Sequence, residues 1–343
     1  MSDGNSSQSG DSKHLSPMTV PRMFGDVPPF MAVDHTPNLT GVTADAVVIG
    51  MPYDGIATFR GGATRRAPQE IRKYSLLFGG YNFDWDLDAW DHVRVTDAGD
   101  VDVLPGNSAE SYARLERRID EITAIGAVPL MIGGDHGVTY PAVKAVARAT
   151  GAPMGVLIFD THLDLSESFR EDRLTRASPV RRICELPEVD PRRIAIIGAR
   201  GPRNIAEWTP QARELGIRVY KMAEVEARGI AAVVTEALTI VSPDGHLPYI
   251  SVDIDGIDPA YAPATNSLEP GGFTSREIIT GVRLAAANGF AGFDVVEVAP
   301  DFDNPTGTTS VLAARLMAEA ICCLAAKNAG IGPTWKFAPP DSP

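Results

Sequence analysis

Short, unbroken apolar runs recur along the middle of the chain, separated by longer stretches in which apolar residues return every three or four positions. The short runs predict eight strands, at 46–51, 93–97, 128–132, 155–159, 193–197, 218–220, 248–253 and 292–298. Continuous apolar runs without polar alternation are typical of strands that are covered on both faces. The pattern therefore predicts a sheet that is buried between two layers.

The stretches between these runs have helical spacing and predict helices at 67–77, 109–125, 140–150, 205–215, 223–241, 275–288 and 307–327. The clearest helix start is Thr274 with Glu277, the spacing of a capping box in which the two side chains satisfy free backbone donors. Gly289 suits the stop, because glycine readily takes the left-handed conformation. Strands that alternate with helices predict a parallel sheet, either an eight-stranded barrel or an open sheet.

The sequence predicts one folded domain with two appended segments. Residues 1–43 are predicted as a flexible N-terminal arm, since the first 20 or so are rich in Ser, Gly and Asp and the rest is irregular and proline-rich. No linker interrupts the body, so 44–330 is predicted as one catalytic domain. Residues 331–343 are predicted as a loosely held, proline-rich tail.

Composition narrows the class of protein. A formal net charge of -13 argues against binding to nucleic acid or to an anionic membrane. The start of the chain lacks the apolar core of a signal peptide, and no apolar run approaches the length of a membrane span. The three cysteines form no C-x-x-C pair, and Cys322 and Cys323 are predicted as buried thiols. A cytoplasmic protein fits these features.

Candidate chemistry begins at the end of one predicted strand, in the run Asp160-Thr-His-Leu-Asp164. In an extended chain, alternate side chains leave the same face, so Asp160, His162 and Asp164 would point to one place. Three buried polar groups are costly unless something binds them, and a divalent metal ion is the usual ligand. The alternative for this run by itself is a solvated loop.

Three further polar clusters follow predicted strands: His136 follows 128–132, Asp253 and Asp255 close 248–253, and Glu297 lies in 292–298. Sites in α/β proteins lie at the carboxyl ends of parallel strands. The combined donor set fits a two-metal site, with bridging carboxylates and ions on the order of 3.5–4 Å apart. Its predicted ligands are His136, Asp160, His162, Asp164, Asp253 and Asp255.

Several motifs from Gly50 to Arg315 resemble the ureohydrolases, the family of arginase and agmatinase, and the agmatinase branch looks closer. The motifs that carry the resemblance are Gly133-Gly-Asp-His-Gly-Val-Thr-Tyr-Pro141, Asp160-Thr-His-Leu-Asp164, Ser251-Val-Asp-Ile-Asp-Gly-Ile-Asp-Pro259 and Asp294-Val-Val-Glu-Val298. The resemblance implies an open three-layer α/β/α fold with an eight-stranded parallel sheet, assembled into trimers or hexamers.

The resemblance also implies roles for the site residues. His136, Asp160, Asp164 and Asp253 would bind one ion, and Asp160, His162, Asp253 and Asp255 the other. The two ions would be Mn²⁺ by default, with Ni²⁺ possible, and a hydroxide between them would attack the carbon of a small cationic guanidine. Glu297 would hold the guanidinium through charge-assisted hydrogen bonds, and Asp164 would handle the proton. The products would be urea and an amine.

Two positions depart from the family pattern and are predicted to shape the substrate pocket. Arg176 stands where agmatinases carry a histidine thought to shuttle protons, and arginine does not act as a general base. An arginine near the cavity mouth would repel the distal ammonium of agmatine and suit a carboxylate or a smaller guanidine. Asn266 stands at the pocket rim where the family has glycine.

These residues support several functional hypotheses. The first is a binuclear amidinohydrolase for agmatine, a guanidino acid, guanidine or a substituted biguanide such as metformin. The second is a metal-binding subunit of a hetero-oligomeric ureohydrolase that needs a partner chain for activity. A non-enzymatic scaffold and a deacetylase-like enzyme are weaker alternatives, because the intact ligands and Glu297 favour guanidine chemistry.

Overall fold

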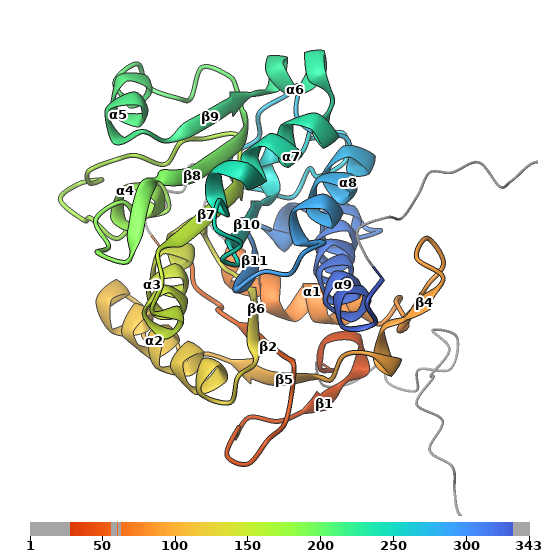
Figure 1. The fold of residues 1–343 in the computed structure, drawn as a ribbon. Helices are drawn as coiled ribbons and strands as arrows, with labels where there is room; N and C mark the ends of the chain where they lie inside the picture. The colour runs from red at the N-terminus through yellow and green to blue at the C-terminus, as the bar shows by residue number, and fades with distance from the viewer. Residues whose placement is uncertain (1–27, 56–59, 61–62, 332–343) are drawn as a thin grey trace, which may run out of the picture.

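A central parallel sheet organises the computed structural model, which describes residues 28–55, 60 and 63–331 (Figure 1). The order of its nine strands is β1-β5-β2-β6-β11-β10-β7-β8-β9, and every neighbouring pair is parallel. The strands are β1 (Asp34–His35), β2 (Ala46–Gly50), β5 (Val95–Asp100), β6 (Val128–Ile132), β7 (Met154–Phe159), β8 (Val189–Ala199), β9 (Arg218–Lys221), β10 (Tyr249–Asp253) and β11 (Gly292–Val296).

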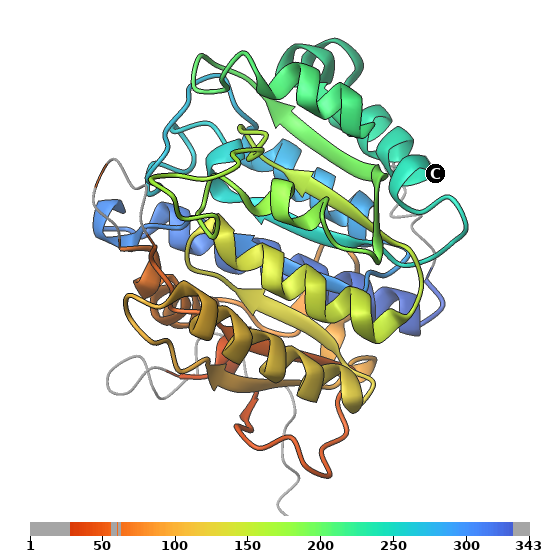
Figure 2. The same ribbon diagram turned by 90° about the vertical axis from the view of Figure 1, so that its left-hand side faces the viewer.

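Helices cover both faces of this sheet and make the fold a three-layer α/β/α sandwich (Figure 1). One face carries α1 (Ala67–Ser75), α6 (Met222–Arg228), α7 (Ile230–Val241), α8 (Ser275–Ala286) and α9 (Thr308–Asn328). The other face carries α2 (Ser108–Ala124), α3 (Thr139–Thr150), α4 (Pro179–Ile183) and α5 (Trp208–Leu215). Figure 2 looks onto this second face, with α2 and α3 in front of the strands.

The two faces of each central strand feed two separate hydrophobic cores. On β2, Ala46 and Val48 pack with α1 and α9, whereas Val47 and Ile49 pack with α2 and α3. Because successive side chains point to opposite faces and both faces are covered, every position must be apolar. This double burial explains why the sequence shows continuous apolar runs and no alternation.

The predicted fold class and all eight predicted strands are confirmed, and the central sheet contains one further strand. The ninth strand, β1, pairs with β5 at one edge of the sheet and falls inside the segment that was predicted as an irregular arm. Two polar residues produce no apolar run, so the sequence pattern could not reveal it. The sheet has two edges, β1 and β9, and is therefore open and not a barrel.

The predicted helices are confirmed in position, but one of them is divided in two, and one short helix and one pair of short strands are additional. Predicted helix 223–241 is two helices, because Gly229 at φ +80° and ψ 147° adopts a conformation that breaks the helix between α6 and α7. The short helix α4 and the antiparallel pair β3 (Tyr81–Asn82) and β4 (Leu87–Asp88) were not predicted. The capping box of Thr274 and Glu277 is present, and Gly289 has a positive φ.

Helix α9 is long and apolar enough to match a membrane span by length and composition, but 89% of the relevant window is buried inside the protein. It packs against α1, α8 and β11, so it is a core helix of the sandwich. Cys322 and Cys323 lie on this helix as buried free thiols, as predicted. Residues 1–27 of the predicted arm and 332–343 of the predicted tail lie outside the described residues.

Candidate active site

Four neighbouring strands deliver the candidate site from their carboxyl ends. In sheet order they are β6, β11, β10 and β7, and they are followed or closed by the polar clusters that the sequence singled out. Parallel strands place their carboxyl ends at one edge, so clusters far apart in sequence converge there. The structure brings together all six predicted metal ligands and Glu297.

The first ligand cluster forms around His136. Its Nδ1 lies 3.0 Å from Asp164 Oδ2, and 3.1 Å from both Asp160 Oδ2 and Asp253 Oδ2. His136 and its three carboxylate neighbours are all buried. Three carboxylates around one imidazole nitrogen form a compact set of mixed nitrogen and oxygen donors.

The second cluster forms around His162 and shares Asp160 with the first. His162 Nδ1 lies 3.3 Å from Asp255 Oδ2 and 3.5 Å from Asp160 Oδ1. Within each of the two groups, His136–Asp160–Asp164 and Asp160–His162–Asp255, one donor atom per residue lies within 4.8 Å of the others. One carboxylate common to two clusters is what a pair of bridged ions requires.

Several atoms of these two clusters lack the partners that buried polar atoms normally have, and the clusters could each hold a metal ion. His136 Nδ1, Asp160 Oδ2 and Asp255 Oδ1 are buried and have no hydrogen-bond partner among the described residues. Leaving such atoms unsatisfied is costly, and a bound cation would remove that cost. Mixed imidazole and carboxylate donors suit ions such as manganese or nickel.

Close packing of charged groups in the clusters raises the pKa values of His136 and Asp164. Burial opposes the charged form of His136, but the nearby carboxylates of Asp160, Asp164 and Asp253 outweigh it and raise the pKa of His136 well above its ordinary value. Burial, with the charge of Asp160, raises the pKa of Asp164 to about 6. Ions that bind here must displace these protons, so the apparent metal affinity should rise with pH.

A buried carboxylate for which the sequence motifs predicted no role, Asp294, supports His136 through a neighbouring serine. Asp294 on β11 accepts hydrogen bonds from Ser251 Oγ at 2.6 Å, Tyr249 Oη at 2.8 Å and Thr139 Oγ1 at 2.9 Å. Ser251 Oγ also lies 3.4 Å from His136 Nε2, so it connects this carboxylate to the imidazole. The available signal was an acidic residue inside an otherwise apolar strand, which needs partners there.

The ligands after β7 converge through a loop and not through the extended strand that the alternating spacing suggested. The strand ends at Phe159, and Asp164 takes a left-handed φ of +48°. Thr161 Oγ1 anchors the loop by donating to Asp255 O at 2.7 Å. Glu297 also has a left-handed φ, of +64°. Such backbone is uncommon away from glycine and concentrates at functional sites.

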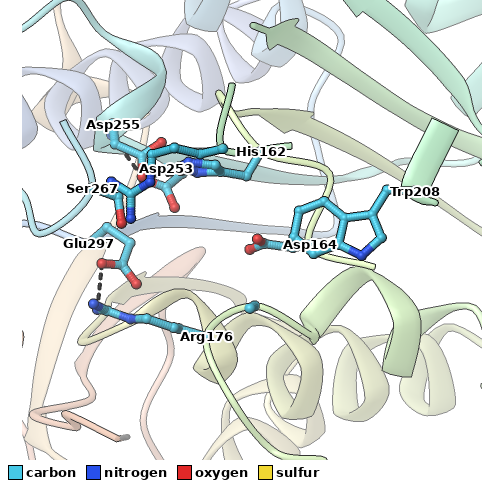
Figure 3. A pocket seen from close by; sticks show the side chains of 10 residues that line it. His162, Asp164, Arg176, Trp208, Asp253, Asp255, Ser267 and Glu297 are labelled. Carbon is cyan, nitrogen blue, oxygen red and sulfur yellow. Dashed lines mark hydrogen bonds and ion pairs between the residues drawn. The ribbon is translucent and has the colours of Figure 1, made fainter. Parts of the chain in front are cut away.

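A cavity of about 120 Å³ opens on this edge of the sheet (Figure 3). Its lining combines metal ligands with residues from the loops, namely His162, Asp164, Arg176, Ala177, Arg203, Trp208, Asp253, Asp255, Ser267 and Glu297. Trp208 and Arg203 were missed, since a single aromatic or basic residue near a helix start carries no distinctive pattern. Asn266 is buried beside Ser267 and is not in this lining, so its substrate role stays a prediction.

Arg176 differs in position from the expected arginine at the cavity mouth. Its side chain is only 6% exposed, and its Nη2 donates to Glu297 Oε2 at 2.5 Å (Figure 3). The other oxygen of Glu297 accepts from the backbone N–H of His136 at 2.8 Å. Burial raises the pKa of Glu297 above its ordinary value, and the guanidinium of Arg176 opposes that rise and favours the charged carboxylate.

Comparison with known proteins agrees with this geometry. Residues 44–323 match the Arginase family. A guanidinopropionase of Pseudomonas aeruginosa is 38% identical, over 91% of this chain and 95% of its own, and a mitochondrial agmatinase of Gallus gallus is 35% identical, over 82% and 81%. The structure of a proclavaminate amidinohydrolase from Streptomyces clavuligerus has a TM-score of 0.81 at 33% identity, covering 89% of this chain and 99% of that one. The chain therefore belongs to the arginase family of hydrolases, which act on guanidino carbon–nitrogen bonds.

Proposed function

We propose that this chain is a binuclear metal-dependent amidinohydrolase that converts a small guanidino compound and water into urea and an amine. One observation carries the proposal: two ligand clusters share Asp160, and the carboxylate of Glu297 lies in the wall of the same cavity. A metal-stabilised scaffold needs no buried carboxylate beside an open cavity. The names of the relatives, guanidinopropionase and agmatinase, support guanidino compounds as substrates.

The residues divide the chemical work between them. A guanidinium is resonance-stabilised and a poor electrophile, so it needs a strong nucleophile and fixed orientation. When bound, the two ions would supply a water whose pKa is lowered toward neutrality. Glu297 accepts N–H groups of the substrate and fixes its plane. Asp164, which lines the cavity, takes the proton of the attacking water and passes it to the leaving nitrogen.

The overall reaction balances in atoms and charge. A carbon–oxygen bond forms to the central carbon and one carbon–nitrogen bond breaks, so a guanidinium ion and water give urea and an ammonium ion. Manganese is the first ion to test and nickel the second, because both suit mixed nitrogen and oxygen donors. A cytoplasmic location and a trimeric or hexameric assembly belong to the same proposal.

The test is urea release from a panel of guanidines by the full chain, loaded separately with manganese and with nickel. The panel holds agmatine, guanidinobutyrate, guanidinopropionate, arginine, guanidine and metformin. Turnover of any member by the wild type, with two ions bound per chain, supports the proposal. The test variant is Asp160→Asn, which removes the shared carboxylate, and its control is Asp190→Asn, which changes a half-buried acid at the amino end of β8 that does not line the cavity. Equal activity of these two variants would contradict it.

A second candidate function follows from position 176. Arginine cannot take up and release a proton near neutral pH, so the chain lacks the shuttle that the family resemblance leads one to expect there. A partner chain in a hetero-oligomer would then have to supply that group. If the purified chain binds two ions but releases no urea, while its mixture with a genomic neighbour does, this second function replaces the first.

A further inference from the structure

Arg176 holds the carboxylate that a substrate guanidinium would need. Its Nη2 donates to Glu297 Oε2 at 2.5 Å, and the other oxygen, Oε1, is already held by the backbone N–H of His136. In Figure 3 the guanidinium of Arg176 lies directly against the carboxylate of Glu297 at the cavity wall. The side chain of arginine and the reactive end of the substrate are the same chemical group. The two therefore compete for one oxygen.

Arg176 also carries unused hydrogen-bonding capacity. Its Nε and Nη1 are buried and have no hydrogen-bond partner among the described residues. A guanidinium offers its donors as a planar fork that matches a carboxylate in two parallel hydrogen bonds. The single bond to Glu297 leaves this fork largely unfilled, which points to a second acceptor that the chain itself does not provide among those residues.

The charge of Arg176 persists when Glu297 is engaged elsewhere. Burial opposes the charge, but Glu297, Asp135, Asp54 and Asp253 outweigh it and raise the pKa of Arg176. The carboxylate of Asp135 is occupied by the backbone N–H groups of Gly55 at 2.7 Å and Gly137 at 3.0 Å. An incoming guanidinium thus displaces a permanent cation, which stays buried beside the cavity.

We propose that the substrate is a zwitterionic guanidino acid that opens the Arg176–Glu297 pair by exchange. The substrate guanidinium takes the place of Arg176 on Glu297, and the substrate carboxylate takes the place of Glu297 on Arg176. Two ion pairs replace one, and no buried charge is left alone. This inference rests on the proposed hydrolysis of guanidino compounds and makes Arg176 its specificity-determining residue.

The same count of charges disfavours guanidine substrates whose far end is an ammonium or an alkyl group. A guanidine with a distal ammonium adds a second cation next to the displaced arginine, and a simple alkylguanidine leaves the arginine without an acceptor. Both outcomes leave the buried arginine without the carboxylate that directly contacts it, which is unfavourable.

Arg203 is the competing anchor, since it also lines the cavity and is exposed. Arg173 is the control, because it lies on the same loop as Arg176 but is exposed and pairs with Glu167 outside the cavity. The test compares Arg176→Met, Arg203→Met and Arg173→Met, each as the full chain with its metal content and melting temperature measured. Urea release gives kcat/KM for guanidinoacetate, guanidinopropionate and guanidinobutyrate against agmatine and propylguanidine.

We expect the wild type to prefer the guanidino acids, and Arg176→Met to reduce that preference by at least about 100-fold. The KM for propylguanidine should fall in the same variant, because the internal competitor is gone. If Arg176 had only a structural role, the substitution would lower kcat/KM for all substrates by a similar factor. A preference that stays within threefold in Arg176→Met, or that disappears only in Arg203→Met, overturns the proposal.

A binding measurement separates this inference from the proposed reaction. Calorimetry with guanidinium chloride and metal-loaded protein should show tighter binding to Arg176→Met than to the wild type and to Arg173→Met. This result stands even if no panel member releases urea, an outcome that would refute the proposed reaction alone. Equal guanidinium affinity in all three proteins would show that Arg176 does not compete for Glu297, and the exchange would be wrong.

Discussion

Two arginine–carboxylate pairs of this molecule are both buried, yet they are built in opposite ways. Arg72 grips Asp97 with two bonds, Nε to Oδ2 at 2.7 Å and Nη2 to Oδ1 at 2.9 Å, and its Nη1 reaches Asp100. Asp97 also accepts from the backbone N–H groups of Phe30 and Gly99. The Arg176–Glu297 pair has one bond, with Arg176 Nε and Nη1 unsatisfied within the described residues.

The difference teaches how to tell a structural pair from a working one. The Arg72–Asp97 pair is closed, because each polar atom has a partner, and it ties α1 to β5 and to the backbone at Phe30. The Arg176–Glu297 pair is open, faces a cavity, and includes a residue with a positive φ. Unsatisfied donors and strained backbone reduce stability, so their joint presence points to function.

The largest effect is expected from removing the carboxylate that the two clusters beside the Arg176–Glu297 pair share. Asp160→Asn should lower urea release by more than about 100-fold and reduce bound metal, because one carboxylate serves both clusters. Added manganese should raise the melting temperature of the wild type but not of this variant, because an ion stabilises the folded protein only when it binds to it. Wild-type metal content together with wild-type activity would show that the cluster is not the metal centre.

Stability measurements sharpen the contrast between the two pairs directly. Arg72→Met should lower the free energy of unfolding by about 3–5 kcal/mol, because it leaves the buried Asp97 without its countercharge. Arg176→Met should lower it by less than half as much, because the change also removes two unsatisfied donors and because burial favours protonation of Glu297 once Arg176 no longer opposes it. Urea denaturation at pH 7 measures both, and equal losses would remove the distinction between closed and open pairs.

Position 176 also allows the missing proton shuttle to be restored. Arg176→His should raise agmatine turnover by about 100-fold over Arg176→Met, a typical gain from a positioned acid–base group. Both variants free Glu297, so the difference between them isolates the imidazole from the loss of the internal competitor. If histidine and methionine give the same kcat, proton transfer at this position does not limit the reaction.

The smallest effect is expected at an exposed pair with the bidentate geometry of the closed one. Arg94 donates to Asp45 through Nε and Nη2, and hydrogen bonds from Arg94 lower the pKa of Asp45. Asp45→Asn should cost about 0.5 kcal/mol, since solvent screens the pair. Because the native pKa is lowered, this stability is complete above the ordinary value of 3.8 and is lost as the pH falls below it. Unfolding curves at pH 7 and pH 3 check this, and a loss as large as that of Arg72→Met would show that burial is not the deciding variable.

The sequence by itself determined the local elements and the identity of the candidate metal ligands. Apolar runs marked the eight long strands, because double burial allows no polar alternation, and the capping box at Thr274 marked the start of α8. The six ligands were recognisable because acidic residues and histidines at the ends of apolar strands are costly without a bound ion. Patterns of this kind depend on residues that are close in sequence, so they can be recognised without knowledge of the fold.

Tertiary structure alone decided which ends meet and how the cavity is charged. Strands β6, β11, β10 and β7 are neighbours although β11 follows β6 by more than 150 residues, and no local pattern encodes that order. The same packing produces three further features. They are the two-residue strand β1, the support of His136 by Asp294 through Ser251, and the contact of Arg176 with Glu297. These features are contacts between distant segments, whose energies come from burial and pairing in three dimensions, so only the folded chain reveals them.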